Sequence, residues 1–386
     1  MRILFSISGI GLGHSTRCHR IISRLDSGND IYIITSGDGL KYFTRLRYKV
    51  YPLPQIQFKW GESGFSLLNT LVSTYINLNW YGSWVKLERR LIKHINPDML
   101  VIDSRIETIF SSINLNLPKL IITNQISVAT RYRVIDDALI LPFFPKIWLS
   151  SNTYKIIIPD FPPPYTLTYM NNIKPIQYYG SDLLDKIVFT GPLIDMPRDM
   201  VLPSHESRKW DVVFFISGPE LDRKIFSNKM LRVLRSLSKK YRVYMSLGDP
   251  SLKSLSIERR YYKIEGWARS QYEALSSGRV CIVRGGHTTI MEAIYTLTPI
   301  IVIPAKNQTE QIENGLRVRE LGIGEAMDPG WLSNSQDELM HYISKILNNL
   351  DKYVWRMSKL RRILLRSDPI NKVVDLINVL GGSRGG

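Results

Sequence analysis

The stretch Val280-Cys-Ile-Val-Arg-Gly-Gly-His-Thr-Thr-Ile-Met-Glu-Ala-Ile294 contains the pattern that decides the fold. Its first four residues are apolar and rich in valine and isoleucine, which is typical of a buried strand. The two glycines that follow predict a tight turn, and the apolar residues after the turn recur with helical spacing. A further apolar run over residues 299–303 predicts a second strand. A strand, a glycine turn, a helix and another strand form one unit of a parallel sheet covered by helices.

The same alternation extends in both directions along the chain. Strands are predicted at residues 3–8, 31–35, 99–102, 120–123, 156–158 and 187–190, and again at 211–217, 242–246, 261–264, 280–283 and 299–303. A proline-rich segment without periodicity, residues 191–204, separates the two series as an interdomain linker would. We therefore predict an α/β fold of two Rossmann-like, doubly wound parallel-sheet domains that face each other across a cleft. The domains are residues 1–195 and 205–350, and residues 351–386 would form a C-terminal helix that could cross back, with a disordered tail.

The composition indicates a protein with an anionic partner. The 386 residues are 44% hydrophobic, enough for two cores, and carry a net charge of +17. That charge suits nucleic acid, an acidic membrane face, phosphate-bearing substrates or simply a solvated surface, and no nucleic-acid-binding motif accompanies it. No stretch reaches the roughly 20 apolar residues of a membrane-spanning helix. Cys18 and Cys281 have no paired spacing, so we expect both to be buried in a protein of the cytoplasm.

The glycine turn after the 280–283 strand is a predicted phosphate site. Gly285 and Gly286 allow close backbone approach, and the amides at the start of the next helix attract anions. Thr288 and Thr289 add hydroxyl groups, and Arg284 adds a positive charge. The alternative is an ordinary turn in which a threonine caps the helix.

The residues that follow this turn resemble the donor site of the GT-B glycosyltransferases, the group that includes the lipid II synthase and the UDP-glycosyltransferases. The resemblance is carried by the glycine-threonine turn, the helix residue Glu292, the strand that ends at Pro304, and Gln308-Thr-Glu-Gln-Ile-Glu-Asn-Gly315. It implies transfer of a hexose or N-acetylhexosamine from a UDP-linked or related nucleotide sugar, without a metal ion or other cofactor. The implied donor-binding residues are Ser217, Gly218, Trp267, Arg284, Gly285, Gly286, His287, Thr288, Thr289, Glu292, Glu310 and Gln311.

Within that set the resemblance implies separate roles. The turn residues would hold the diphosphate, Glu292 the ribose, and Glu310 with Gln311 the sugar hydroxyls. Trp267 would stack on the base, or it would be a core tryptophan. Retaining enzymes of this fold typically carry a glutamate seven residues before the helix glutamate, where this chain has Gly285. The resemblance therefore implies an inverting reaction.

The N-terminal loop Ser8-Gly-Ile-Gly-Leu-Gly-His-Ser-Thr-Arg17 follows the first strand and opens a helix. A dehydrogenase is disfavoured, because Thr35-Ser-Gly37 stands where a ribose-binding acid is expected. The loop resembles the acceptor loop of the same glycosyltransferase group, which implies an acceptor site at Gly11, Gly13 and Arg17. His14 would be the general base, a ligand of the acceptor's phosphate, or a helix cap.

Asp103 and Glu107 are the other predicted candidates for the base. Asp103 ends a strand and Glu107 lies one turn into the next helix, so both would lie at the carboxyl edge of the sheet. Asp103 would equally serve as the cap of that helix.

Two segments suggest a membrane surface. Residues 67–95 combine apolar and aromatic residues with lysines and arginines, and residues 139–149 are apolar. Either core packing or contact with an anionic membrane face explains them. A polyprenyl-phosphate acceptor would explain the net charge as well as nucleic acid does. Two other functions stay open: a nucleotide-sugar 2-epimerase of the same fold, and a non-catalytic subunit of a membrane glycosyltransferase complex. The sequence does not predict an oligomeric state.

Overall fold

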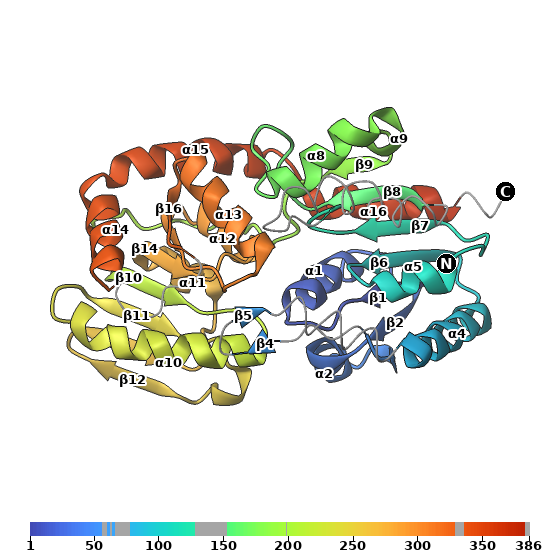
Figure 1. The fold of residues 1–386 in the computed structure, drawn as a ribbon, viewed down its shortest axis with the longest axis horizontal. Helices are drawn as coiled ribbons and strands as arrows, with labels where there is room; N and C mark the ends of the chain where they lie inside the picture. The colour runs from blue at the N-terminus through green and yellow to red at the C-terminus, as the bar shows by residue number, and fades with distance from the viewer. Residues whose placement is uncertain are drawn as a thin grey trace. The chain divides into compact units, whose positions relative to one another are not determined.

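The computed structural model describes residues 1–55, 60–61, 64–65, 78–127, 153–197, 199–328 and 336–382. The chain divides into two compact units (Figure 1). Unit 1 comprises Met1–Lys59, Leu67–Asp195 and Asp368–Gly386. Unit 2 comprises Trp60–Ser66 and Met196–Ser367.

Unit 1 is built on a seven-stranded parallel sheet in the order β3-β2-β1-β6-β7-β8-β9. The order reverses between β1 and β6, so the chain leaves these two neighbouring strands in opposite directions along the sheet. Such a reversal marks the place where doubly wound sheets bind ligands. The strands are β1 (Arg2–Ile7), β2 (Asp30–Thr35), β3 (Lys49–Pro52), β6 (Met99–Asp103), β7 (Lys119–Ile122), β8 (Thr153–Ile158) and β9 (Ile187–Phe189).

Helices cover both faces of this sheet because alternate residues of each strand are apolar on opposite sides. Ile3 and Phe5 pack on one face with α1 and α16, whereas Leu4 packs on the other with α4 and α5. The helices are α1 (Gly13–Ile22), α2 (Gly37–Arg45), α4 (Leu78–Ile95), α5 (Ile106–Ser112), α8 (Tyr169–Tyr179), α9 (Ser181–Leu184) and α16 (Pro369–Gly382).

Unit 2 repeats the architecture with the strand order β12-β13-β11-β10-β14-β15-β16. In this sheet, as far as the structure describes it, the pairing of β12 with β13 is antiparallel and the other pairings are parallel. The strands are β10 (Trp210–Phe215), β11 (Val243–Ser246), β12 (Ser256–Arg259), β13 (Tyr262–Glu265), β14 (Gly278–Val283), β15 (Ile300–Val302) and β16 (Gly324–Ala326). A short hairpin, β4 (Trp60–Gly61) with β5 (Gly64–Phe65), also belongs to this unit.

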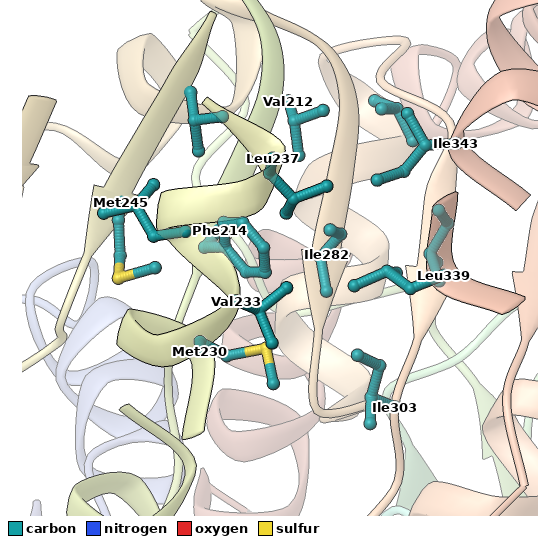
Figure 2. Packing of buried hydrophobic residues seen from close by; sticks show 14 of the residues in the cluster. Val212, Phe214, Met230, Val233, Leu237, Met245, Ile282, Ile303, Leu339 and Ile343 are labelled. Carbon is teal, nitrogen blue, oxygen red and sulfur yellow. The ribbon is translucent and has the colours of Figure 1, made fainter. Parts of the chain in front are cut away.

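The core of unit 2 is a layer of apolar side chains between the sheet and its helices (Figure 2). Phe214 of β10 and Ile282 of β14 contribute from the sheet, Met230 from α10 and Leu339 from α14. The helices are α10 (Glu220–Leu237), α11 (Gln271–Ser276), α12 (His287–Tyr295), α13 (Thr309–Glu320), α14 (Gln336–Asn348) and α15 (Leu350–Leu365), with a 3-10 turn at Pro250–Leu252.

The predicted fold of two parallel-sheet α/β domains is confirmed, and every predicted strand is present to within a few residues. The strands that were not predicted are β3, β12, β16 and the β4–β5 hairpin. Each of them is short, and β12 is exposed along its whole length, so none has the apolar run on which the prediction relied.

The C-terminal part of the chain is divided between the units, since α15 belongs to unit 2 and α16 to unit 1. Of the predicted membrane-facing segments, residues 67–77 and 139–149 lie outside the described residues. Residues 78–95 form α4. Among the described helices, none is long and apolar enough to span a membrane.

Candidate functional site

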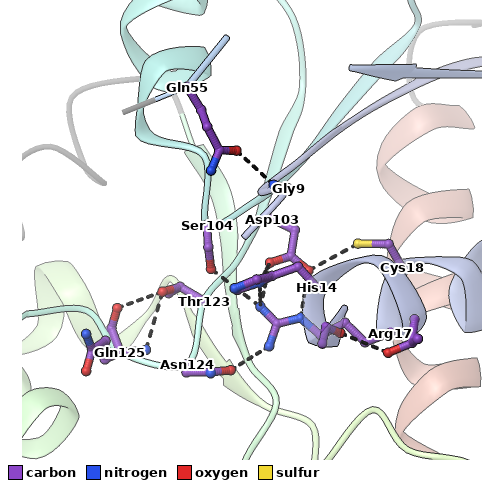
Figure 3. Close-up of polar contacts among 12 residues, drawn as sticks. Gly9, His14, Arg17, Cys18, Gln55, Asp103, Ser104, Thr123, Asn124 and Gln125 are labelled. Atoms are coloured by element: carbon purple, nitrogen blue, oxygen red, sulfur yellow. Dashed lines mark hydrogen bonds and ion pairs between the residues drawn. The ribbon is translucent and has the colours of Figure 1, made fainter. Parts of the chain in front are cut away.

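In unit 1, the loop after β1 and the end of β6 bring His14 and Asp103 together (Figure 3). The two strands are parallel neighbours with Ile7 opposite Asp103, so their carboxyl ends meet at one edge of the sheet. His14 lies in the first turn of α1, and its Nδ1 is 2.8 Å from Asp103 Oδ1. The Asp103 side chain is completely buried, whereas that of His14 is 24% exposed.

Arg17 holds the same carboxylate from one turn further along α1. Its Nε and Nη2 donate to the two oxygens of Asp103 at 2.6 and 2.5 Å, and its Nη1 donates to Asn124 Oδ1 at 2.5 Å. Cys18 Sγ lies 3.1 Å from Asp103 Oδ2. Burial alone would raise the pKa of Asp103, but the positive charge of Arg17, assisted by His14, outweighs it and holds that pKa well below the usual range.

An ionised Asp103 fixes the state of the His14 ring. A carboxylate can only accept hydrogen bonds, so Nδ1 must be the nitrogen that carries the proton and donates it. In neutral His14, Nε2 then has a free lone pair. Within the described residues, Nε2 has no hydrogen-bond partner. The arrangement leaves one ring nitrogen of a partly exposed histidine able to accept a proton, while a buried acid orients the ring.

The structure distinguishes the alternatives predicted for these residues. Neither His14 nor Asp103 acts as a helix cap: α1 is preceded by Leu12 and α5 by Arg105, and neither of these helix starts has a capping side chain. Arg17, predicted to bind an acceptor phosphate, is 4% exposed and bonded to Asp103, so its role is revised to holding that acid. Glu107 lies half-buried in the first turn of α5.

The glycines of the N-terminal loop differ in backbone conformation, exposure and packing. Gly11 adopts a φ of +66°, which favours glycine. Gly13 is the exposed first residue of α1. Gly9 packs so closely against Ser36 that a Cβ there would lie 2.0 Å from the Ser36 carbonyl oxygen. The loop is therefore fixed against the start of α2 while its exposed end carries His14.

In unit 2, the turns after β10 and β14 meet at the carboxyl edge of neighbouring strands. Helix α12 begins at His287 after Gly286, and no side chain caps it. The threonine-cap alternative is therefore not what the structure has, because Thr288 and Thr289 lie inside the first turn. Ser217 Oγ lies 3.4 Å from Thr289 Oγ1, which joins the Ser217–Gly218 turn to the helix start. Gly218 has a φ of +120°.

The structure revises the role predicted for Arg284. Its guanidinium is buried and forms a two-pronged ion pair with Asp222 of α10, at 2.7 and 3.1 Å. The remaining terminal nitrogen donates to the carbonyl of Ile303 at 2.9 Å. Its charge is thus neutralised within the protein, and it ties the end of β14 to α10. Contact with a diphosphate would require this pair to break.

Replacing Arg284 with methionine is expected to reduce the free energy of unfolding of unit 2 by about 3 kcal/mol or more, because Asp222 would be left as a buried, unpaired charge. Hydrogen exchange of the β10 and β14 amides at increasing urea concentrations measures the loss in the free energy of unfolding. Replacing Asp222 with leucine in the same chain should restore most of it. Equal stability of the single and double variants would contradict this account.

Side chains of α13 hold the backbone at the glycine turn that follows β14 and at the end of β15. Asn314 Nδ2 donates to the carbonyl of Gly285 at 2.9 Å, and Gln311 Oε1 accepts from the backbone N–H of Ala305 at 2.8 Å. Gly285 has a φ of +89°, and a Cβ there would lie 2.7 Å from Val302 Cγ1. Of the two residues predicted to bind sugar hydroxyls, Gln311 is therefore engaged through its carbonyl oxygen, while Glu310 is half-buried in the first helical turn.

Substituting alanine for Gly285 is expected to cost about 2 kcal/mol or more, since both the positive φ and the contact with Val302 oppose a side chain. The matched control is Gly286→Ala: no atom lies within 4 Å of a Cβ at Gly286, and its φ is −63°. The control should change stability by less than about 0.5 kcal/mol. A similar melting temperature for the two variants would refute the packing argument.

The other predicted donor residues differ in exposure. Glu292 is 1% exposed on α12, where its Oε1 accepts from Gln271 Nε2 at 2.5 Å. Trp267 lies in the loop after β13 and is only half-buried, unlike a core tryptophan. His287 is buried at the start of α12.

Within the described residues, no group of three or more His, Cys, Asp or Glu side chains is placed to hold a metal ion.

Two family models match the chain. Residues 212–366 match the glycosyltransferase family 28 C-terminal domain, and residues 1–139 match a glycosyl transferase family 1 model. The protein is a glycosyltransferase of the GT-B type. Hexose specificity and an inverting mechanism stay predictions.

The glycosyltransferase has full-length relatives. It is 26% identical to an uncharacterized glycosyltransferase of Methanosarcina mazei over the whole of both chains. It is also 32% identical to the UDP-N-acetylglucosamine–N-acetylmuramyl-(pentapeptide) pyrophosphoryl-undecaprenol N-acetylglucosamine transferase of Thermosipho africanus, over 26% of this chain and 29% of that protein. The fold resembles the crystal structure of the glycotransferase of kitacinnamycin, with a TM-score of 0.68, 15% identity and 98% of each chain covered. The predicted likeness to the lipid II synthase is thus limited to part of the glycosyltransferase.

Several residues that organise the site of the glycosyltransferase were not predicted. Asp222 pairs with Arg284, Asn124 holds Arg17, and Gln271 bonds to Glu292. Asp222 carried a weak signal, as an acid in the first turn of a helix that follows a glycine turn. Asn124 and Gln271 lie next to strand and helix ends and carried none, because their partners are distant in sequence.

Proposed function

We propose that this glycosyltransferase moves a hexose or N-acetylhexosamine from a UDP-linked sugar to a hydroxyl or phosphate group of an acceptor, with inversion at the anomeric carbon. The observation that carries the proposal is the buried Asp103 that orients His14. It supplies what an incoming acceptor oxygen requires, a partly exposed base with a defined lone pair.

In the proposed step, His14 Nε2 removes the proton of the acceptor group as its oxygen attacks the anomeric carbon. A new carbon–oxygen bond forms on the face opposite the nucleotide, and the bond from that carbon to the diphosphate breaks. The nucleoside diphosphate leaves with the bonding electrons, and the proton stays on the imidazole, where Asp103 stabilises the resulting cation.

The donor's diphosphate is proposed to lie at the start of α12. The backbone amides at the start of this helix and the helix dipole favour negative charge there, and Ser217, Thr288 and Thr289 provide hydroxyl groups at the same edge. These groups would stabilise charge that develops on the leaving diphosphate without a metal ion. Trp267 remains the candidate for stacking on the base, and Glu292 for the ribose.

The inverting outcome is supported by the geometry of Gly285. A side chain at this position would collide with Val302, so a glutamate of the kind implied for retaining relatives has no room. A single displacement from the face of the sugar opposite the nucleotide then requires only one base, which His14 provides.

The net charge of +17 suits a phosphate-bearing acceptor, and we propose a lipid-phosphate-linked or glycan acceptor on this ground. The partial likeness to an enzyme named for a pyrophosphoryl-undecaprenol acceptor supports the lipid-linked class.

The first test is a thermal screen of nucleotide sugars against the full chain. A donor present at 100 times its Kd adds about 2.7 kcal/mol to the free energy of unfolding, and therefore raises Tm by several degrees. The donor that gives the shift is then incubated with polyprenyl-phosphate or glycan acceptors. Transfer with inverted anomeric configuration, detected by NMR of the product, is the expected result.

The same donor is next incubated alone, which separates the proposed transferase from the 2-epimerase. Rapid epimerisation or elimination without any acceptor would overturn the proposal. Absence of any nucleotide-sugar shift would favour the non-catalytic subunit instead.

A further inference from the structure

Helix α15 of unit 2 has one face made almost entirely of cations and a tryptophan. Lys352, Trp355, Lys359 and Arg362, with Arg366 directly after the last helical residue, recur at intervals of three and four residues. At 3.6 residues per turn, these positions fall within an arc of about 80°. We call them the α15 face. The helix packs inward through Tyr353, Met357, Leu360 and Leu364, on the opposite side.

The α15 face is open to solvent. Trp355 is 58% exposed, and all four cationic residues are exposed as well. Lys359 Nζ lies 3.4 Å from the centre of the Trp355 ring, so a cation and the aromatic group already form one patch. Along the part of the chain that the structure describes, none of these four cations forms an ion pair.

The residues at the edges of the face do not cancel this charge. Asp351, the neighbouring acid, lies beside the stripe at its N-terminal end, while Arg356 adds a further cation from a half-buried position near Gly322. The stripe extends over about 21 Å at 1.5 Å per residue. The face therefore combines one exposed aromatic ring with positive charge along its length.

We propose that the α15 face docks on an anionic lipid bilayer. Lysine and arginine heads would lie among the lipid phosphates, with their aliphatic stems toward the acyl boundary, and Trp355 would sit at the headgroup level. A duplex nucleic acid accounts for the charge but not for the exposed indole, because its bases are already stacked on one another. The inference goes beyond the proposed transfer reaction, since docking requires neither donor nor acceptor.

The test is sedimentation of the full chain with vesicles of phosphatidylcholine alone or with 30% phosphatidylglycerol. Binding is expected only to the anionic vesicles and should weaken strongly between 50 and 500 mM salt, because exposed charges are screened. The quadruple variant K352Q/K359Q/R362Q/R366Q should bind at least about 100-fold more weakly. Trp355→Ala should weaken binding about tenfold.

A matched control separates the α15 face from the overall charge. The variant K239Q/K253Q/R259Q/R260Q removes four exposed cations from other parts of unit 2 and gives the same net charge. It should keep binding within about threefold of the parent chain. Melting temperatures of all variants confirm folding, since every changed residue is on the surface.

Equal losses in the two quadruple variants would overturn the proposal, because binding would then follow net charge alone. Unchanged vesicle binding in the α15 quadruple variant would also overturn it. Tighter binding of duplex RNA than of anionic vesicles, lost in the α15 variant and unaffected by Trp355→Ala, would assign the face to nucleic acid instead.

Discussion

Replacing His14 with alanine is expected to lower the rate of sugar transfer by about 10² to 10⁴-fold, the range that a positioned general base contributes. The side chain is 24% exposed and is anchored through Nδ1 to Asp103, so its loss removes a base and little packing. Initial rates with the donor and acceptor found by the screens measure the effect. The donor-induced rise in Tm should persist, because the proposed donor residues all belong to unit 2.

Two further variants test whether the loss of rate in His14→Ala comes from the loss of a basic nitrogen at His14. His14→Gln retains an N–H group that can reach Asp103 but has no basic nitrogen, so it should lose as much activity as the alanine variant. His19→Ala removes another histidine of α1, one bonded to Tyr42 at 3.0 Å, and should retain activity within about threefold. If His14→Ala kept more than a third of the parental rate, His14 would not be the base.

The strands could be predicted because their signal is local. Each long parallel strand is a run of β-branched residues that must be buried on both faces, and that requirement is visible in a window of a few residues. The edge strands β12 and β16 need not be buried on both faces. Ser256–Arg259 is exposed throughout and Gly324–Ala326 has three residues, so neither contributes the apolar run that would mark it.

The partners within the site could not be predicted, since they depend on the order of strands. Asp103 and Arg17 are 86 residues apart and meet only because β6 lies beside β1. The sequence placed Asp103 correctly at a strand end, but it left open whether the acid acts as a base or a cap. The same limit explains why Arg17 and Arg284 were predicted to bind phosphate. A local pattern shows a cation near a glycine turn, but the acid that neutralises it comes from another element of the fold.

Loss of the Asp103 carboxylate is expected to destabilise unit 1 strongly. Replacing it with asparagine leaves Arg17, which is 4% exposed, as a buried cation without its acid. Breaking a buried ion pair from one side costs about 3 to 5 kcal/mol. Hydrogen exchange of the β1 and β6 amides at pH 7 measures the change in the free energy of unfolding. Transfer activity should fall as well, since His14 loses the group that orients it.

The pH dependence of the free energy of unfolding shows whether Asp103 is ionised or neutral in the folded protein. Its pKa in the folded chain is held well below the ordinary value, chiefly by Arg17 against the opposing effect of burial. The stabilising contribution is therefore complete above the unfolded pKa of about 3.9 and is lost as pH falls from there through the folded pKa. As pH falls below about 4, the parent chain should lose stability more steeply than Asp103→Asn. Parallel curves would mean that the acid carries no charge in the folded protein, and the orientation of His14 would then need another explanation.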